Sequence, residues 1–191
     1  MKTFTNGEIE PASNLNKALF LDRDGTIVDY VPYLSKPEQV MIPLGAALAL
    51  KQWQDAGYLL VIVTNQSGIG RGYFTTSDLE AIHARICQEY ANFKVFFHDI
   101  LVCPHHPAEA CQCRKPSPYM LFQSSKKHKI DVSRSFFVGD APSDIECAIH
   151  AGCHPILVLT GRGQSTAKNL DKYASKISIF DSLKDTVQLI Q

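Results

Sequence analysis

Two aspartates lie two positions apart in the segment Asp22-Arg23-Asp24-Gly25-Thr26, and they are the first candidates for catalysis in this chain. One carboxylate can attack phosphorus and form an aspartyl-phosphate, while a second carboxyl group protonates the leaving oxygen and later accepts a proton from water. The glycine that follows allows the chain to turn sharply. The segment therefore indicates phosphoryl transfer, although acids in glycine-containing turns also serve as helix caps or solvated turn residues.

Such chemistry requires positive charge to neutralise the phosphoryl group. Mg²⁺ prefers oxygen ligands in an octahedral arrangement, and carboxylates, a backbone carbonyl, phosphate and water are typical members of its ligand set. Asp140 and Asp144 can complete such a set with the first two acids, and Lys115 is a candidate to balance the remaining phosphoryl charge. The sequence thus predicts a magnesium site opposite a lysine.

Three thiols and an imidazole occur within a short segment and have the composition of a closed structural zinc site. The candidate ligands are Cys103, His105, Cys111 and Cys113. His106 is an alternative fourth ligand, and a cluster of free thiols without metal is the alternative to a zinc site. Since the segment runs directly into Lys115, zinc would pre-set the position of this lysine.

Short apolar runs that end abruptly in polar residues precede the acids and predict buried strands. We expect strands at 18–21, 59–63, 100–102, 136–138 and 156–159, and helices at 46–53, 76–91, 118–129 and 143–151. This alternation predicts a doubly wound, Rossmann-like α/β fold, with a parallel sheet covered by helices on both faces. Ligands collect beyond the carboxyl ends of such strands, where Asp22, Thr64 and Asp140 would lie.

Length and composition limit the class of protein. With 191 residues, we expect a loose N-terminal arm over residues 1–16 and a single domain over residues 17–191. Because 19 Lys and Arg balance 19 Asp and Glu, no overall positive field favours nucleic acid. No apolar run is long enough for a membrane span and no secretory signal is visible, so we expect a cytoplasmic protein that acts on a small metabolite.

Taken together, these motifs resemble the haloacid dehalogenase superfamily of phosphohydrolases over about residues 18–160. The matching motifs are Asp22-x-Asp24-Gly25-Thr26, Thr64 at the end of its strand, Lys115 in Arg114-Lys115-Pro116, and Gly139-Asp140 with Asp144. All four occur in the order that the superfamily has. The resemblance therefore implies an enzyme, with an aspartate nucleophile and a bound Mg²⁺.

The resemblance also implies a role for each matching residue. Asp22 would be the nucleophile and Asp24 the general acid and base. Thr64 and Lys115 would bind phosphate, and Mg²⁺ would be held by Asp22, the backbone carbonyl of Asp24 and Asp140, with Asp144 behind them.

A narrower resemblance is to the heptose bisphosphate phosphatases of this superfamily, with the histidinol phosphatases close behind. It is carried by Thr64-Asn65-Gln66-Ser67-Gly68-Ile69, by Arg71-Gly72, and by the loop from Cys103-Pro104-His105-His106-Pro107 to Cys111-x-Cys113-Arg114-Lys115-Pro116. It implies removal of the 7-phosphate of a heptose 1,7-bisphosphate on the route to lipopolysaccharide precursors. The substrate-binding residues that it implies are Tyr33, Thr64, Asn65, Gln66, Arg71, Arg114 and Lys115.

Those enzymes cover their site with loops instead of a large cap domain, and this chain has no insertion long enough to fold alone. Small size and a loop-covered site favour a monomer. The chain departs from the family at Ala141, where a basic residue usually follows the aspartate of the fourth motif. The corresponding contact would be missing or would come from another residue, such as Arg71.

Several alternatives remain open at the level of sequence. The short cysteine loop matches the histidinol phosphatases, whereas residues 65–69 and the following Arg71-Gly72 favour the heptose enzymes. That segment also resembles polynucleotide 3′-phosphatases, although the neutral charge and the cysteine loop argue against them. A zinc-loop interaction module on an inactive scaffold would require one of the acids to be missing, and all four are present.

Overall fold

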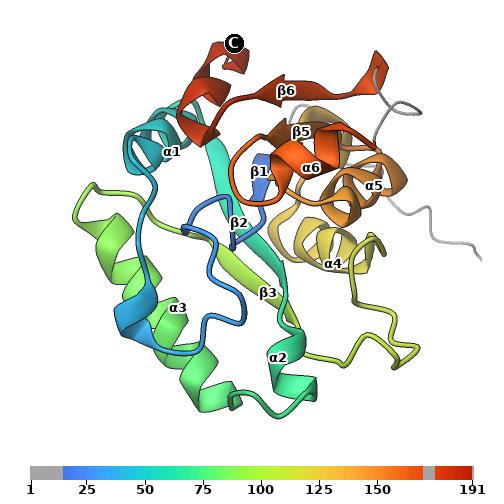
Figure 1. The fold of residues 1–191 in the computed structure, drawn as a ribbon. Coiled ribbons are helices and arrows are strands. Elements are labelled where there is room, and N and C mark those ends of the chain that lie inside the picture. Colours follow the sequence, from blue (N-terminus) through green and yellow to red (C-terminus); the bar gives the residue numbers. More distant parts are fainter. Residues whose placement is uncertain (1–14, 170–174, 191) are drawn as a thin grey trace, which may run out of the picture.

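The computed structural model describes residues 15–169 and 175–190, and its centre is a six-stranded sheet (Figure 1). The strands are β1 (Lys17–Leu21), β2 (Tyr58–Asn65), β3 (Asp99–Cys103), β4 (Phe136–Gly139), β5 (His154–Val158) and β6 (Ser178–Phe180). They lie in the order β3-β2-β1-β4-β5-β6, and every neighbouring pair is parallel. The predicted doubly wound α/β fold is confirmed.

Helices cover both faces of the sheet. They are α1 (Ala46–Asp55), α2 (Ser67–Gly70), α3 (Thr76–Ala91), α4 (Tyr119–His128), α5 (Pro142–Ala151) and α6 (Gly163–Ala167), with 3₁₀ helices η2 (Pro37–Gln39), η3 (Val132–Arg134) and η5 (Leu183–Leu189). Leu19 and Leu21 of β1 pack with α1 and α3, whereas Ala18 and Phe20 pack with α4 and α5. Because successive strand side chains point to opposite faces, a wholly apolar strand needs helices on both sides.

The C-terminal part contains three elements that the sequence did not predict, α6, β6 and η5. Strand β6 extends the sheet beside β5, and η5 follows it and packs against α1. Trp53 of α1 is fully buried there, and its indole Nε1 donates a hydrogen bond of 3.0 Å to Thr186 Oγ1 of η5. Local periodicity misses β6 and η5 because their contacts are with segments far away in the chain.

The expected N-terminal arm falls mostly outside the described residues. Asn16, its last residue, lies beside Ile130 in an isolated parallel bridge, and its backbone N–H donates to the carbonyl of Lys129. Within the described ranges, no helix is both long and apolar enough to cross a membrane.

Candidate active site

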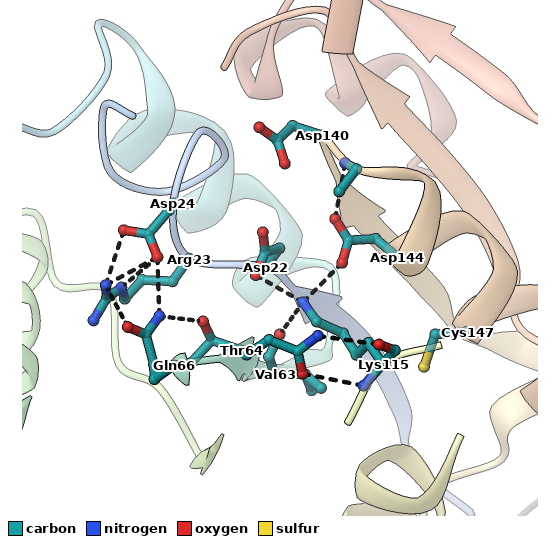
Figure 2. Close-up of polar contacts among 12 residues, drawn as sticks. Asp22, Arg23, Asp24, Val63, Thr64, Gln66, Lys115, Asp140, Asp144 and Cys147 are labelled. Carbon is teal, nitrogen blue, oxygen red and sulfur yellow. Dashed lines mark hydrogen bonds and ion pairs between the residues drawn. The ribbon is translucent and has the colours of Figure 1, made fainter. Parts of the chain in front are cut away.

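Three carboxylates gather beyond the carboxyl ends of β1 and β4, which are neighbours in the sheet (Figure 2). Asp22 follows β1, Asp140 follows β4, and Asp144 lies in the first turn of α5. All three side chains are buried, and one oxygen of each lies within 4.8 Å of the others. The structure thus brings together the acids that the sequence predicted as a magnesium site.

Lys115 points into this cluster from the end of the cysteine loop (Figure 2). Its Nζ lies 2.7 Å from Asp22 Oδ1, 2.7 Å from Asp144 Oδ1 and 2.7 Å from the carbonyl oxygen of Val63. Burial of this side chain disfavours its charged form, but Asp144 and Asp22 outweigh that effect and hold the pKa of Lys115 above its ordinary range. The lysine is therefore a fixed cation beside the expected nucleophile.

The cluster has more negative charge than its neighbours can neutralise. Burial and the nearby Asp22 raise the pKa of Asp140, and the same two causes raise the pKa of Asp144 to about 7 in spite of Lys115. Crowded carboxylate oxygens are the ligands that Mg²⁺ prefers, and a divalent cation would remove the repulsion between them. The donor set therefore fits the predicted magnesium ion.

A loop after β5 holds the Asp140 carboxylate from the other side. The backbone N–H of Arg162 donates to Asp140 Oδ2 at 2.7 Å, and its Nη2 lies 3.3 Å from Oδ1. Gly25 and Gly161 flank this carboxylate, and a Cβ atom at either position would overlap Asp140 Oδ2. Arg162 was not predicted as a site residue, although it lies between two glycines shortly after a predicted strand, a pattern that could have indicated it.

Asp24 lies next to the cluster and has its own set of partners (Figure 2). Arg23 Nε donates to Asp24 Oδ2 at 3.1 Å, and Arg23 Nη2 donates to Oδ1 at 2.9 Å. Gln66 Nε2 donates to Asp24 Oδ2 at 2.9 Å and to Thr64 Oγ1 at 2.8 Å. The expected general acid and base is therefore held by side chains from the segments that directly follow β1 and β2.

Asn65, the last residue of β2, contacts the backbone of Lys115. Its Nδ2 donates to the Lys115 carbonyl at 3.1 Å, and its Oδ1 accepts from the Lys115 N–H at 3.1 Å. The segment after β2 also contacts the start of the cysteine loop, because the N–H of Gln66 donates to the Cys103 carbonyl and the N–H of Gly70 to the Pro104 carbonyl. Both ends of the cysteine loop are thus tied to the end of β2.

The four predicted zinc ligands converge within this loop. The members of the cluster are Cys103, His105, Cys111 and Cys113. The Sγ of Cys111 lies 3.6 Å from that of Cys103 and 3.9 Å from that of Cys113, and His105 Nδ1 lies 3.6 Å from Cys103 Sγ and 3.2 Å from Cys113 Sγ.

These spacings fit a zinc ion, because tetrahedral ligands with Zn–S bonds of about 2.3 Å lie roughly 3.8 Å from one another. The alternative ligand His106 lies outside the cluster, and its Nδ1 accepts a hydrogen bond from the N–H of Ala108.

A cleft of about 290 Å³ opens over the carboxylates. The residues predicted to bind phosphate or substrate all line it: Tyr33, Thr64, Asn65, Gln66, Arg71, Arg114 and Lys115. Tyr30 and Arg162 line it as well, and the Arg162 guanidinium lies 5.6 Å from the centre of the Tyr30 ring. Although Ala141 supplies no charge, the cleft thus has cationic side chains from four separate loops.

The chain is similar in sequence to a family of hydrolases and to phosphatases of known activity. Residues 112–186 match the family described as HAD-hydrolase-like. The chain is 42% identical to D-glycero-beta-D-manno-heptose-1,7-bisphosphate 7-phosphatase of Pseudomonas putida, over 87% of this chain and 95% of that protein. It is 39% identical to D-glycero-alpha-D-manno-heptose-1,7-bisphosphate 7-phosphatase of Photorhabdus laumondii, over 80% of this chain and 87% of that one.

A solved structure has the same architecture. The crystal structure of D,D-heptose 1,7-bisphosphate phosphatase from B. bronchiseptica, complexed with magnesium and phosphate, superposes with a TM-score of 0.84. It is 31% identical, and the match covers 91% of this chain and 97% of that chain.

Proposed function

Because this chain belongs to the haloacid dehalogenase superfamily of phosphohydrolases, we propose that it removes the 7-phosphate of D-glycero-D-manno-heptose 1,7-bisphosphate. The activities named for relatives that are 42% and 39% identical support this substrate, and they include both anomers of the heptose. The observation that carries the proposal is the meeting of Asp22, Asp140 and Lys115 at the base of one cleft.

The reaction proceeds in two steps in this proposal. An oxygen of Asp22 attacks phosphorus, the bond from phosphorus to the sugar oxygen breaks, and Asp24 donates its proton to that oxygen. Water then attacks the aspartyl-phosphate, Asp24 accepts a proton from the water, and the bond to Asp22 breaks to release phosphate. Lys115 holds the attacking carboxylate in place and balances the charge of the transferred group.

Magnesium would be held in the proposed site by Asp22, Asp140 and the Asp24 carbonyl, with Asp144 behind them. Its contribution when bound is to neutralise the carboxylates and the phosphoryl oxygens. Thr64 donates its hydroxyl hydrogen to the phosphoryl group, since the Thr64 oxygen already accepts from Gln66. The zinc ion in the cysteine loop is structural in this proposal, because all four of its positions can be filled by the protein.

The rim of the cleft favours a substrate with a second anionic group. Arg71, Arg114 and Arg162 line the cleft in addition to the buried Lys115. One buried Nη atom of Arg114 has no hydrogen-bond partner in the described part of the chain, and a buried guanidinium nitrogen gains stability when it meets an anion. A bisphosphate would thus occupy the base and the rim of the cleft together.

A reducing cytoplasm suits this proposal, because the cysteine loop would bind zinc through free thiols and the described cysteines form no disulfide. A monomeric state remains a prediction.

A kinetic panel with Mg²⁺ tests the function. Its substrates are both anomers of the heptose bisphosphate, fructose bisphosphate, histidinol phosphate and a DNA 3′-phosphate. We expect the highest kcat/KM for a heptose bisphosphate, and a preference for histidinol phosphate or the DNA end would overturn the proposal.

A further inference from the structure

Two neighbouring amides at the end of β2 contact different catalytic groups. The family resemblance implied that both Asn65 and Gln66 bind the substrate, and both line the cleft. In the structure, however, the Gln66 side chain bonds to the group around Asp24, whereas the Asn65 side chain bonds to the backbone of Lys115. Each polar atom of the two amides therefore has at least one partner within the protein.

The Gln66 amide has a partner for each of its hydrogen-bonding atoms. Its Nε2 donates to Asp24 Oδ2 at 2.9 Å and to Thr64 Oγ1 at 2.8 Å, and its Oε1 accepts from Arg23 Nη2 at 3.0 Å. Only this orientation of the amide works, since a carboxylate accepts hydrogen bonds and a guanidinium donates them. With 5% of its surface exposed, Gln66 has no donor left for a substrate.

Arg23 completes the hold on Asp24. It is 1% exposed, and its Nε and Nη2 reach the two oxygens of Asp24 at 3.1 and 2.9 Å. Two parallel bonds from a planar guanidinium fix both the position and the plane of a carboxylate. The Gln66 side chain bonds to both Arg23 and Asp24, and it therefore adds a third hydrogen bond that fixes the orientation of the Asp24 carboxylate (Figure 2).

We propose that Gln66 and Asn65 are positioning residues with separate duties, and this rests on the proposed phosphatase function. Gln66, with Arg23, aims the carboxyl group of Asp24 at the leaving oxygen. Asn65 fixes the backbone of Lys115 and thereby its ammonium group beside Asp22. The Gln66 amide, whose two N–H donors are both used within the protein, does not bind the substrate directly.

The two positioning roles can be told apart by the leaving group of the substrate. A sugar alkoxide is a strong base and needs a proton from Asp24 as it leaves, whereas p-nitrophenolate is a weak base and leaves without one. Lys115 stabilises the phosphoryl group and the nucleophile, which are the same for both kinds of ester. A defect at Gln66 should therefore depend on the leaving group, and a defect at Asn65 should not.

The test compares Gln66→Leu with its matched neighbour Asn65→Leu. Single-turnover rates, and steady-state kcat and KM, are measured for a sugar phosphate and for the release of p-nitrophenolate from p-nitrophenyl phosphate. Gln66→Leu should slow the sugar phosphate by ~10²-fold and the aryl phosphate by roughly tenfold less, with KM little changed. Asn65→Leu should slow both esters by similar factors. Equal losses in Gln66→Leu, or a raised KM with unchanged kcat, would overturn the proposal.

The outcome does not depend on the identity of the natural sugar, because any sugar phosphate that the wild-type enzyme hydrolyses can be used. A crystal structure of Gln66→Leu gives a readout without turnover. Asp24 should leave its present rotamer or occupy more than one, while Lys115 stays in place. An unmoved Asp24 would contradict the proposal even if the heptose substrate were wrong.

Discussion

At the scale of single residues, the site is built from like charges that the fold forces together. Asp22, Asp140 and Asp144 are buried within reach of one another, and Lys115 bridges two of them. Repulsion between carboxylates lowers the stability of the protein without metal, so the acids are present for function and not for folding.

The variant Asp22→Asn separates the effect of this carboxylate on turnover from its effect on stability. Removal of the proposed nucleophile should lower turnover by at least ~10³-fold. The melting temperature without metal should stay the same or rise, because the amide removes one of the repelling charges while Asp144 still pairs with Lys115. Steady-state kinetics and thermal unfolding of the same samples check both statements. Substantial residual activity would exclude Asp22 as the nucleophile.

The pH dependence of the metal-free protein follows from Asp144. Burial and Asp22 raise its pKa to about 7, so between about pH 4 and pH 7 the folded state holds a proton that the unfolded state has lost. The free energy of unfolding therefore falls as pH rises through this window and levels off above it. Because Mg²⁺ competes with this proton, the ion should raise the melting temperature more at about pH 8 than at about pH 5. A shift of the same size at both values would contradict the assignment.

At the scale of elements, the cysteine loop and the end of β2 form one unit. Gln66 and Gly70 donate backbone hydrogen bonds to Cys103 and Pro104 at the start of the loop, and Asn65 holds Lys115 at its end. A Cβ atom on Gly70 would overlap the backbone N of His106, so the two segments pack without space between them. The order of the loop therefore determines where Lys115 points.

We expect Cys113→Ser to show this dependence. If the loop binds zinc as proposed, loss of one thiolate should remove the ion, lower stability by at least ~2 kcal/mol and reduce kcat/KM, because Lys115 is no longer held. Metal analysis, thermal unfolding and kinetics check the three effects. Cys87→Ser, on α3 and outside the cluster, is the matched control and should keep its zinc and its activity. Full stability and activity in zinc-free Cys113→Ser would exclude a structural role for the metal.

At the scale of the whole molecule, the C-terminal segment closes one face of the core. Helix η5 packs on α1, where the Thr186 hydroxyl accepts from Trp53 Nε1 and donates to the Leu183 carbonyl. Trp53 and Thr186 are both fully buried. This contact joins residues 133 positions apart in the chain. Trp53 also packs against Tyr58 and Phe136 at the amino ends of β2 and β4, whereas the carboxylates lie beyond the carboxyl ends of strands.

Replacement of this hydroxyl should affect stability alone. Thr186→Val keeps the shape but leaves the buried indole N–H without a partner, at a cost of about 1–3 kcal/mol. Thr186→Ser keeps the hydroxyl and should lose less. Fluorescence of the single tryptophan follows unfolding, and kcat should be unchanged in both variants. Equal stability of Thr186→Val and the wild type would show that the hydrogen bond contributes nothing.

The sequence alone was sufficient for the alternation of strands and helices, the strand ends that carry the acids, and the grouping of the cysteine ligands. These features follow from local rules: apolar runs, the spacing of polar residues behind them, and the ligand chemistry of thiols and carboxylates. Parallel strands then bring their carboxyl ends to one edge of the sheet, so Asp22 and Asp140 meet although they are far apart in the chain.

Only the tertiary structure decided which partner each polar side chain has. Gln66 and Asn65 are adjacent in the chain and were assigned the same duty, yet one contacts Asp24 and the other contacts Lys115. Arg162 reaches Asp140 from a loop outside the motifs, and η5 reaches Trp53 from the far end of the chain. Such contacts depend on which distant segments pack together and on which hydrogen-bond donors are still unpaired where these segments meet. The local spacing of residues along the chain determines neither of these conditions.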